Sequence, residues 1–101
     1  MSLHLPKTAT AVLTELTGEP RPESALFLVL RDAIAYRLEK ITAALKAFED
    51  KYGMSFEEYR ERWEAEDRPE YYAYEAERDF LEWEALVTRR KRLEDLQAWL
   101  W

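Results

Sequence analysis

Apolar residues recur every three or four positions between Pro22 and Tyr52, a spacing that places side chains on one face of an α-helix. The members of this stripe are Phe27, Leu30, Ile34, Leu38, Ile41, Leu45, Phe48 and Tyr52. From Ala25 to Leu30, however, every residue is apolar, so no polar face remains there. A helical segment that is apolar all round has to be enclosed on every side. The pattern therefore predicts a long helix over 22–52 whose first turns are covered by a second copy of the chain.

Two further helical segments follow. Gly53 ends the first long pattern, and Ser55 with Glu58 three residues later forms a capping box that opens a short helix over about 56–66. Arg68-Pro69 interrupts this helix, and a second long apolar pattern extends over about 70–100. Two long helices with a short one between them predict an antiparallel hairpin.

The N-terminal residues show a different pattern. Leu3 and Leu5 alternate with polar residues and Pro6 follows, which is typical of a short β-strand, with a frayed tail as the alternative. A short helix over 8–17 comes next and ends at Gly18. The prediction is an all-α single domain, residues 1–101, that forms an intertwined homodimer. Residues 1–53 are its dimerisation part and residues 54–101 its acidic, aromatic part for partner binding.

Composition narrows the class of protein. Cysteine is absent, which excludes disulfides and thiolate zinc sites, and no apolar run approaches the length of a membrane span. The first residues also lack the layout of a signal peptide, so we expect a cytoplasmic protein with no membrane partner. Asparagine is absent and glutamine occurs once, which suits a heat-adapted source.

The side chains offer little for catalysis. His4 is the only histidine, so a Ser–His–acid or Cys–His site has little to build on. There is no Glu-x-x-His pair for a di-iron bundle and no glycine-rich phosphate loop. We therefore expect a protein that is not an enzyme and that uses no cofactor or metal.

Charge is unevenly distributed along the chain. Residues 1–53 carry seven basic and seven acidic side chains, whereas residues 54–101 carry eight and fourteen. Between positions 56 and 84, twelve carboxylates and four arginines are interleaved with eight of the fourteen aromatic residues. One interpretation is an apolar core with a solvated acidic face. The other is a binding surface of aromatic anchors ringed by negative charge, which complements a basic protein.

The second interpretation gives the leading hypothesis for function, a protein–protein interaction module that binds a basic partner such as a nuclease toxin. The predicted partner contacts are Tyr59, Trp63, Tyr71, Tyr72, Glu75 and Trp101. A purely structural helical adaptor is a further alternative.

Residues 3–38 resemble the ribbon-helix-helix family of small dimeric repressors and antitoxins. The resemblance is carried by Leu3-His4-Leu5-Pro6, by the first helix ending at Gly18, and by the second helix that contains Leu30 to Leu38. It implies that two chains pair their strands and bury their second helices together, often with a C-terminal extension that blocks a toxin. Residues 54–101 are likewise similar to the helical C-terminal halves of small prokaryotic proteins from toxin–antitoxin-type operons.

The resemblance also supplies an interface and an alternative function. The residues that it places at the dimer interface, together with the apolar segment, are Leu3, Leu5, Leu26, Phe27, Leu30 and Ile34. The alternative function is that of a DNA-binding transcriptional repressor. Its contacts would be Ser2, His4, Lys7 and Arg21.

Overall fold

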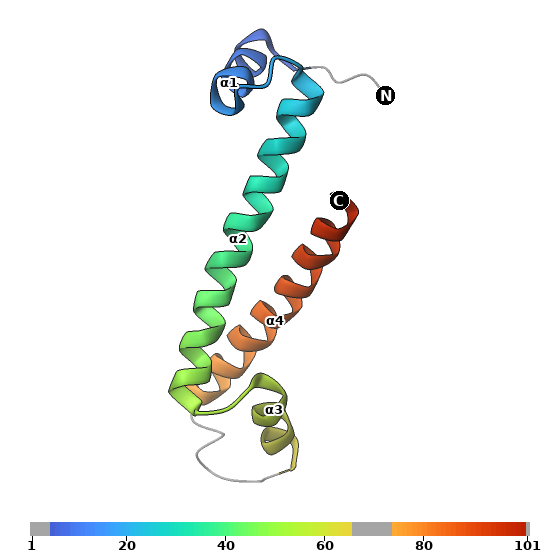
Figure 1. Ribbon diagram of the computed structural model, residues 1–101. Helices are drawn as coiled ribbons and strands as arrows, with labels where there is room; N and C mark the ends of the chain where they lie inside the picture. Colours follow the sequence, from blue (N-terminus) through green and yellow to red (C-terminus); the bar gives the residue numbers. More distant parts are fainter. Residues whose placement is uncertain (1–4, 66–73, 101) are drawn as a thin grey trace.

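The computed structural model describes residues 5–65 and 74–100, and these residues form four helices (Figure 1). They are α1 (Lys7–Thr17), α2 (Pro22–Tyr52), α3 (Phe56–Ala65) and α4 (Tyr74–Leu100). The described residues contain no strand, so the prediction of an all-helical fold is confirmed. No helix in this part of the chain has the length and apolar character needed to cross a membrane.

Helix α2 begins and ends at the predicted residues. Pro22 occupies its first turn, where a missing N–H is tolerated. At the other end Gly53 adopts a left-handed conformation with φ of 67° and donates its N–H to the carbonyl of Glu49. This conformation strongly favours glycine, and it ends the helix by turning the chain away from the helical path.

Helix α3 begins directly after this turn. The Ser55 hydroxyl accepts the backbone N–H of Glu58 at 3.2 Å, so the predicted serine cap is confirmed. The short helix ends at Ala65 in the structure, close to the predicted end at 66. The predicted start of the second long helix, at about 70, lies outside the described residues.

The predicted N-terminal strand is not seen in the described residues. Residues 1–4 lie outside the described part of the chain, and Leu5 and Pro6 have no regular secondary structure. The Pro6 carbonyl accepts the backbone N–H of Thr10 at 3.1 Å, so the chain enters α1 immediately after the proline.

The helices form an elongated arrangement. Helices α2 and α4 pack against each other and run in opposite directions, with α3 beside the end where they are closest and α1 at the far end of α2 (Figure 1). The extents are 59 × 21 × 20 Å and the radius of gyration is 19.6 Å. A compact domain of 100 residues has a radius of gyration of about 13 Å. This fold therefore leaves long helix faces open to solvent.

The core lies at one end of this arrangement. Leu45, Phe56, Tyr59 and Trp83 are buried together, and partly buried side chains of α2, α3 and α4 surround them. In α2, only Ala25 and Leu45 are buried, so nothing between these two positions is fully covered.

Candidate partner-binding surfaces

An aromatic cluster fixes α3 and the start of α4 against the end of α2. The Trp83 ring, fully buried, lies 5.4 Å from the ring of Phe48 and 5.2 Å from that of Tyr59, measured between centroids, and stacks on both. Stacked and tilted aromatic pairs at these distances add to the free energy of burial. The relative positions of the three helices are thus set by apolar packing at this end of the molecule.

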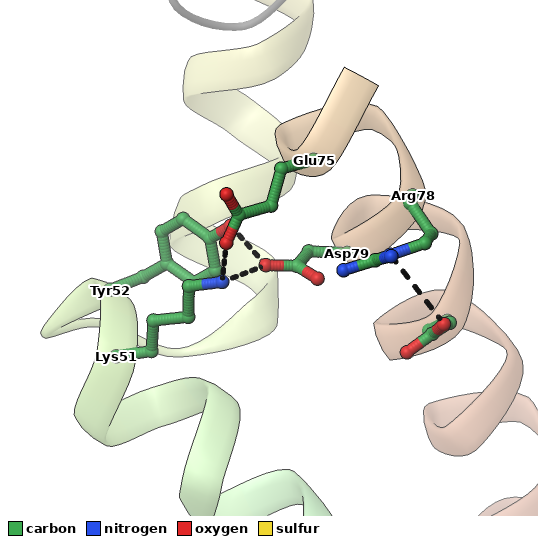
Figure 2. A network of polar contacts seen from close by, with 6 residues as sticks. Lys51, Tyr52, Glu75, Arg78 and Asp79 are labelled. Carbon is green, nitrogen blue, oxygen red and sulfur yellow. Dashed lines mark hydrogen bonds and ion pairs between the residues drawn. The ribbon is translucent and has the colours of Figure 1, made fainter. Parts of the chain in front are cut away.

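A polar network closes the same end of the fold (Figure 2). Asp79 of α4 accepts hydrogen bonds from Lys51 Nζ at 2.5 Å and from the Tyr52 hydroxyl at 2.6 Å. Lys51 also reaches the Glu75 carboxylate at 2.8 Å. The Asp79 side chain is 5% exposed, whereas those of Lys51 and Glu75 are 45% and 66% exposed. The network therefore links a buried carboxylate to surface charges.

The network changes the acidity of its members. Burial alone would raise the pKa of Asp79, but the hydrogen bonds from Lys51 and Tyr52 outweigh burial and hold this pKa below its usual value. Burial, and then the hydrogen bond to Asp79, raise the pKa of the Tyr52 hydroxyl well above its usual value. Asp79 is therefore ionised and Tyr52 neutral at neutral pH.

Sequence reasoning missed this network, although a signal was present. Asp79 lies four positions before Trp83 and three after Ala76, on the apolar stripe of the second long helix. A carboxylate at such a position needs a buried partner. The partners lie 27 and 28 residues earlier in the chain, so the pattern within one helix could not identify them.

The outer faces of α3 and the first part of α4 form an acidic surface. Its eight exposed carboxylates are those of Glu57, Glu58, Glu61, Glu64, Glu75, Glu77, Glu82 and Glu84. Three exposed arginines, at positions 60, 62 and 78, accompany them. Among the described residues, no group of His, Asp or Glu has the arrangement of a metal site. These side chains give the surface a net negative charge.

The predicted partner contacts fall in different environments. Tyr59 is 1% exposed and belongs to the core, which corrects its placement at the surface: its ring is needed to fill the space between α2 and Trp83. Trp63 is half-buried, with its ring stacked 4.8 Å from that of Phe80, and Glu75 is exposed. Tyr71, Tyr72 and Trp101 lie outside the described residues.

Other large apolar side chains are exposed on α4. Tyr74 is 78% exposed, Leu81 57%, Leu96 44% and Trp99 87%. Leu81 and Leu96 lie off the apolar stripe of the helix, so the stripe did not identify them.

The predicted dimer residues of α2 are only partly covered. Phe27 is 39% and Leu30 44% exposed, while Leu26 and Ile34 are half-buried. Leu5 is also half-buried, and Leu3 lies outside the described residues. Helix α1 covers part of this segment, since it packs on the N-terminal part of α2. An apolar surface remains where the α2 stripe extends beyond its contact with α4.

The residues predicted for DNA binding do not form a basic surface in the described part of the chain. Lys7 is the exposed first residue of α1, and the exposed Arg21 pairs with Glu19 at 3.0 Å. Ser2 and His4 lie outside the described residues.

Comparison with protein-family models, with curated proteins and with solved structures finds no match to this chain.

Proposed function

We propose that this protein is an antitoxin-like protein–protein interaction module that binds a basic protein, such as a nuclease toxin, through the acidic surface of α3 and α4. The observation that carries the proposal is the excess of eight exposed carboxylates over three arginines on this surface. Opposite charges speed association and reject partners of like charge. The aromatic core beneath packs α3 against α4, so the helices that carry these carboxylates are already ordered before binding.

Exposed apolar side chains lie within the same surface. Tyr74 is 78% exposed, and Trp63 is half-buried beside the carboxylates of α3. Aromatic residues of this kind supply much of the binding energy at protein interfaces, whereas charges at the rim mainly steer the encounter. Trp63 is therefore the proposed anchor, together with Glu75 and the predicted residues outside the described part.

The proposal includes a homodimer formed through the N-terminal half of α2. Phe27 and Leu30 remain 39% and 44% exposed, and Leu26 and Ile34 are half-buried. The accessible surface is 7781 Å². A compact 12.1 kDa monomer would expose about 6,000 Å². A stable dimer needs to bury only about 800 Å² on each partner, so the surplus is large enough.

The test uses the product of the neighbouring gene in the native operon. We expect that this product is basic, is toxic when expressed alone, becomes harmless when co-expressed with the present protein, and co-elutes with it. A variant in which Glu57, Glu58, Glu61 and Glu64 are changed to Gln should bind at least tenfold more weakly. The difference should shrink as salt is raised, because salt screens exposed charges.

A matched control keeps the fold and the number of substitutions. Glu15, Glu39, Glu49 and Asp50 are exposed carboxylates of α1 and α2, and their replacement by the corresponding amides should leave partner binding unchanged. The proposal is wrong if the neighbouring product is harmless alone and never co-elutes, or if both sets of substitutions weaken binding equally.

A further inference from the structure

The outward face of α4 carries one row of exposed side chains, which are apolar at Tyr74, Leu81, Ala85 and Trp99 and polar at the positions between them. Its positions are Tyr74, Arg78, Leu81, Ala85, Thr88, Arg92, Asp95 and Trp99, which follow one another in steps of four and three residues. This alternation is the spacing of the seam along which two helices supercoil. All eight residues are exposed in the single chain, so the seam has no partner within the described residues.

We propose that this seam pairs with the same seam of a second copy, antiparallel, about a two-fold axis near residues 86 and 87. An isologous contact brings residue i of one chain to residue j of the other, and residue j to residue i. Positions whose numbers add to 173 then face each other. Tyr74 meets Trp99, the two most exposed large apolar side chains of the structure, at 78% and 87%.

The inner positions of this register are also complementary. Arg78 faces Asp95, and the aliphatic part of Arg92 covers Leu81, which is 57% exposed. Ala85 faces Thr88 at the centre, where two small side chains permit the helices to approach closely. Each of these contacts occurs twice because of the two-fold axis. Every pair thus joins either opposite charges or apolar surfaces.

Charges beside the seam favour the antiparallel direction. In an antiparallel pair, the residues on one side of the seam lie next to the residues on the same side of the second copy. Glu82 of one copy therefore lies near Arg89 of the other, and Glu84 lies near Lys91 of the other. The carboxylates are on the N-terminal half of α4 and the basic residues on its C-terminal half. Among the described residues, neither Glu84 nor Arg89 forms an ion pair within its own chain. A parallel pair would instead set Arg78, Arg92 and Asp95 of the seam each against its own copy.

The shape of the α4 surface also fits a second copy of the chain. Arg89, Arg92, Asp95, Leu96 and Trp99 line a hollow on the C-terminal half of α4. In the antiparallel register, the partner's Tyr74 and Leu81 reach this hollow. At 1.5 Å per residue, the 27 residues of α4 provide a seam about 40 Å long. The surplus accessible surface described above exceeds the ~800 Å² per partner of a stable interface.

This pairing goes beyond the proposed function: it covers Tyr74, Glu82 and Glu84 of the acidic surface but uses neither the α3 carboxylates nor the α2 stripe. A chain with both two-fold contacts, one through α2 and one through α4, would form a closed tetramer when the axes cross at right angles. A chain with the α4 contact alone would form a dimer. The two proposals can therefore fail independently.

Charge reversal with mixing tests the pairing by sedimentation equilibrium at low salt. Glu82→Arg and Arg89→Glu should each weaken self-association at least tenfold, because each places like charges together twice. A one-to-one mixture of the two variants should restore the wild-type assembly, since opposite charges then meet at both sites. Lys46→Glu is the control: it makes the same change of charge on an exposed position of α2 and should leave association unchanged.

A third variant separates the two contacts. Leu30→Glu disrupts the proposed α2 contact alone, so it should reduce a tetramer to a dimer. The double variant with Arg89→Glu should then be a monomer. If Leu30→Glu changes nothing while Arg89→Glu yields monomers, the α2 contact is absent and the α4 pairing stands. The α4 pairing is overturned if neither charge reversal weakens association, or if the mixture associates no better than its components.

Discussion

The hydroxyl of Tyr52 donates a hydrogen bond of 2.6 Å to the carboxylate of Asp79, which joins the last residue of α2 to the first turns of α4. Lys51 binds the same carboxylate oxygen (Figure 2). A buried charge is tolerated only when it is paired and hydrogen-bonded, and here one neutral and one cationic donor satisfy it. The Tyr52–Asp79 contact lies beside the aromatic cluster. It therefore helps to hold α4, which carries part of the acidic surface, against α2.

Removal of the Tyr52 hydroxyl should destabilise the fold. We expect Tyr52→Phe to lower the free energy of unfolding by about 1–3 kcal/mol, the range for a hydrogen bond to a charged group. Urea denaturation at pH 7 and a fixed protein concentration measures the change. Tyr36→Phe is the matched control, because Tyr36 is 59% exposed and its hydroxyl makes no hydrogen bond among the described residues. Equal losses in the two variants would show that the Tyr52–Asp79 contact contributes nothing.

The contribution of Asp79 should depend on pH. Its pKa in the folded protein is held below its usual value, so the unfolded chain binds a proton more readily. The stabilisation is therefore fully present above the unfolded pKa of about 3.9 and is lost as pH falls through the folded pKa. Asp79→Asn should lower the free energy of unfolding at pH 7, and the gap to wild type should close below about pH 4.

Denaturation of both proteins at pH 7, 5 and 3 measures this gap. The other carboxylates titrate in wild type and variant alike, so the difference between the two proteins isolates Asp79. A gap that stays constant over this range would mean that folding leaves the pKa of Asp79 unchanged.

Gly53 should be sensitive to substitution for a backbone reason alone. Its φ is 67°, and a Cβ placed there would meet no atom within 4 Å. Gly53→Ala should therefore cost about 1–2 kcal/mol, the penalty for the left-handed conformation in a residue with a Cβ. Gly53→Asn should cost less, since asparagine adopts this conformation more readily. If thermal unfolding gave the opposite order, side-chain crowding would be the cause and this explanation would be wrong.

Local signals explain why much of the fold could be predicted from the sequence. Pro22 and Gly53 act through backbone geometry, so they define α2 without knowledge of the rest of the chain. The Ser55 cap is equally local. The predicted N-terminal strand is not seen at Leu5 and Pro6, which lead directly into α1 because a helix can begin after proline.

The candidate site was harder to predict, since burial depends on contacts between distant residues. Tyr59 and Trp63 have the same helical spacing and the same aromatic character, yet Tyr59 is 1% exposed and Trp63 is half-buried. Their difference comes from the position of Trp83, about twenty residues further along the chain. An aromatic stripe rich in carboxylates on its flanks is thus compatible with a core, with an interface, or with both.

Trp83 should be the most costly residue of the core to truncate, because it is fully buried and contacts rings from both α2 and α3. We expect Trp83→Ala to lower the free energy of unfolding by about 3–5 kcal/mol through lost burial and a residual cavity. Tyr36→Ala on the exposed side of α2 should change it by no more than about 0.5 kcal/mol.

Trp83→Phe distinguishes loss of packing from loss of polarity. The Trp83 Nε1–H group is buried and has no hydrogen-bond partner among the described residues, so its removal relieves a desolvation cost. Phenylalanine also keeps an aromatic ring against Phe48 and Tyr59. The loss should therefore be less than half of that for Trp83→Ala. Equal losses in urea denaturation would indicate that the indole N–H is satisfied and contributes to stability as much as the ring does.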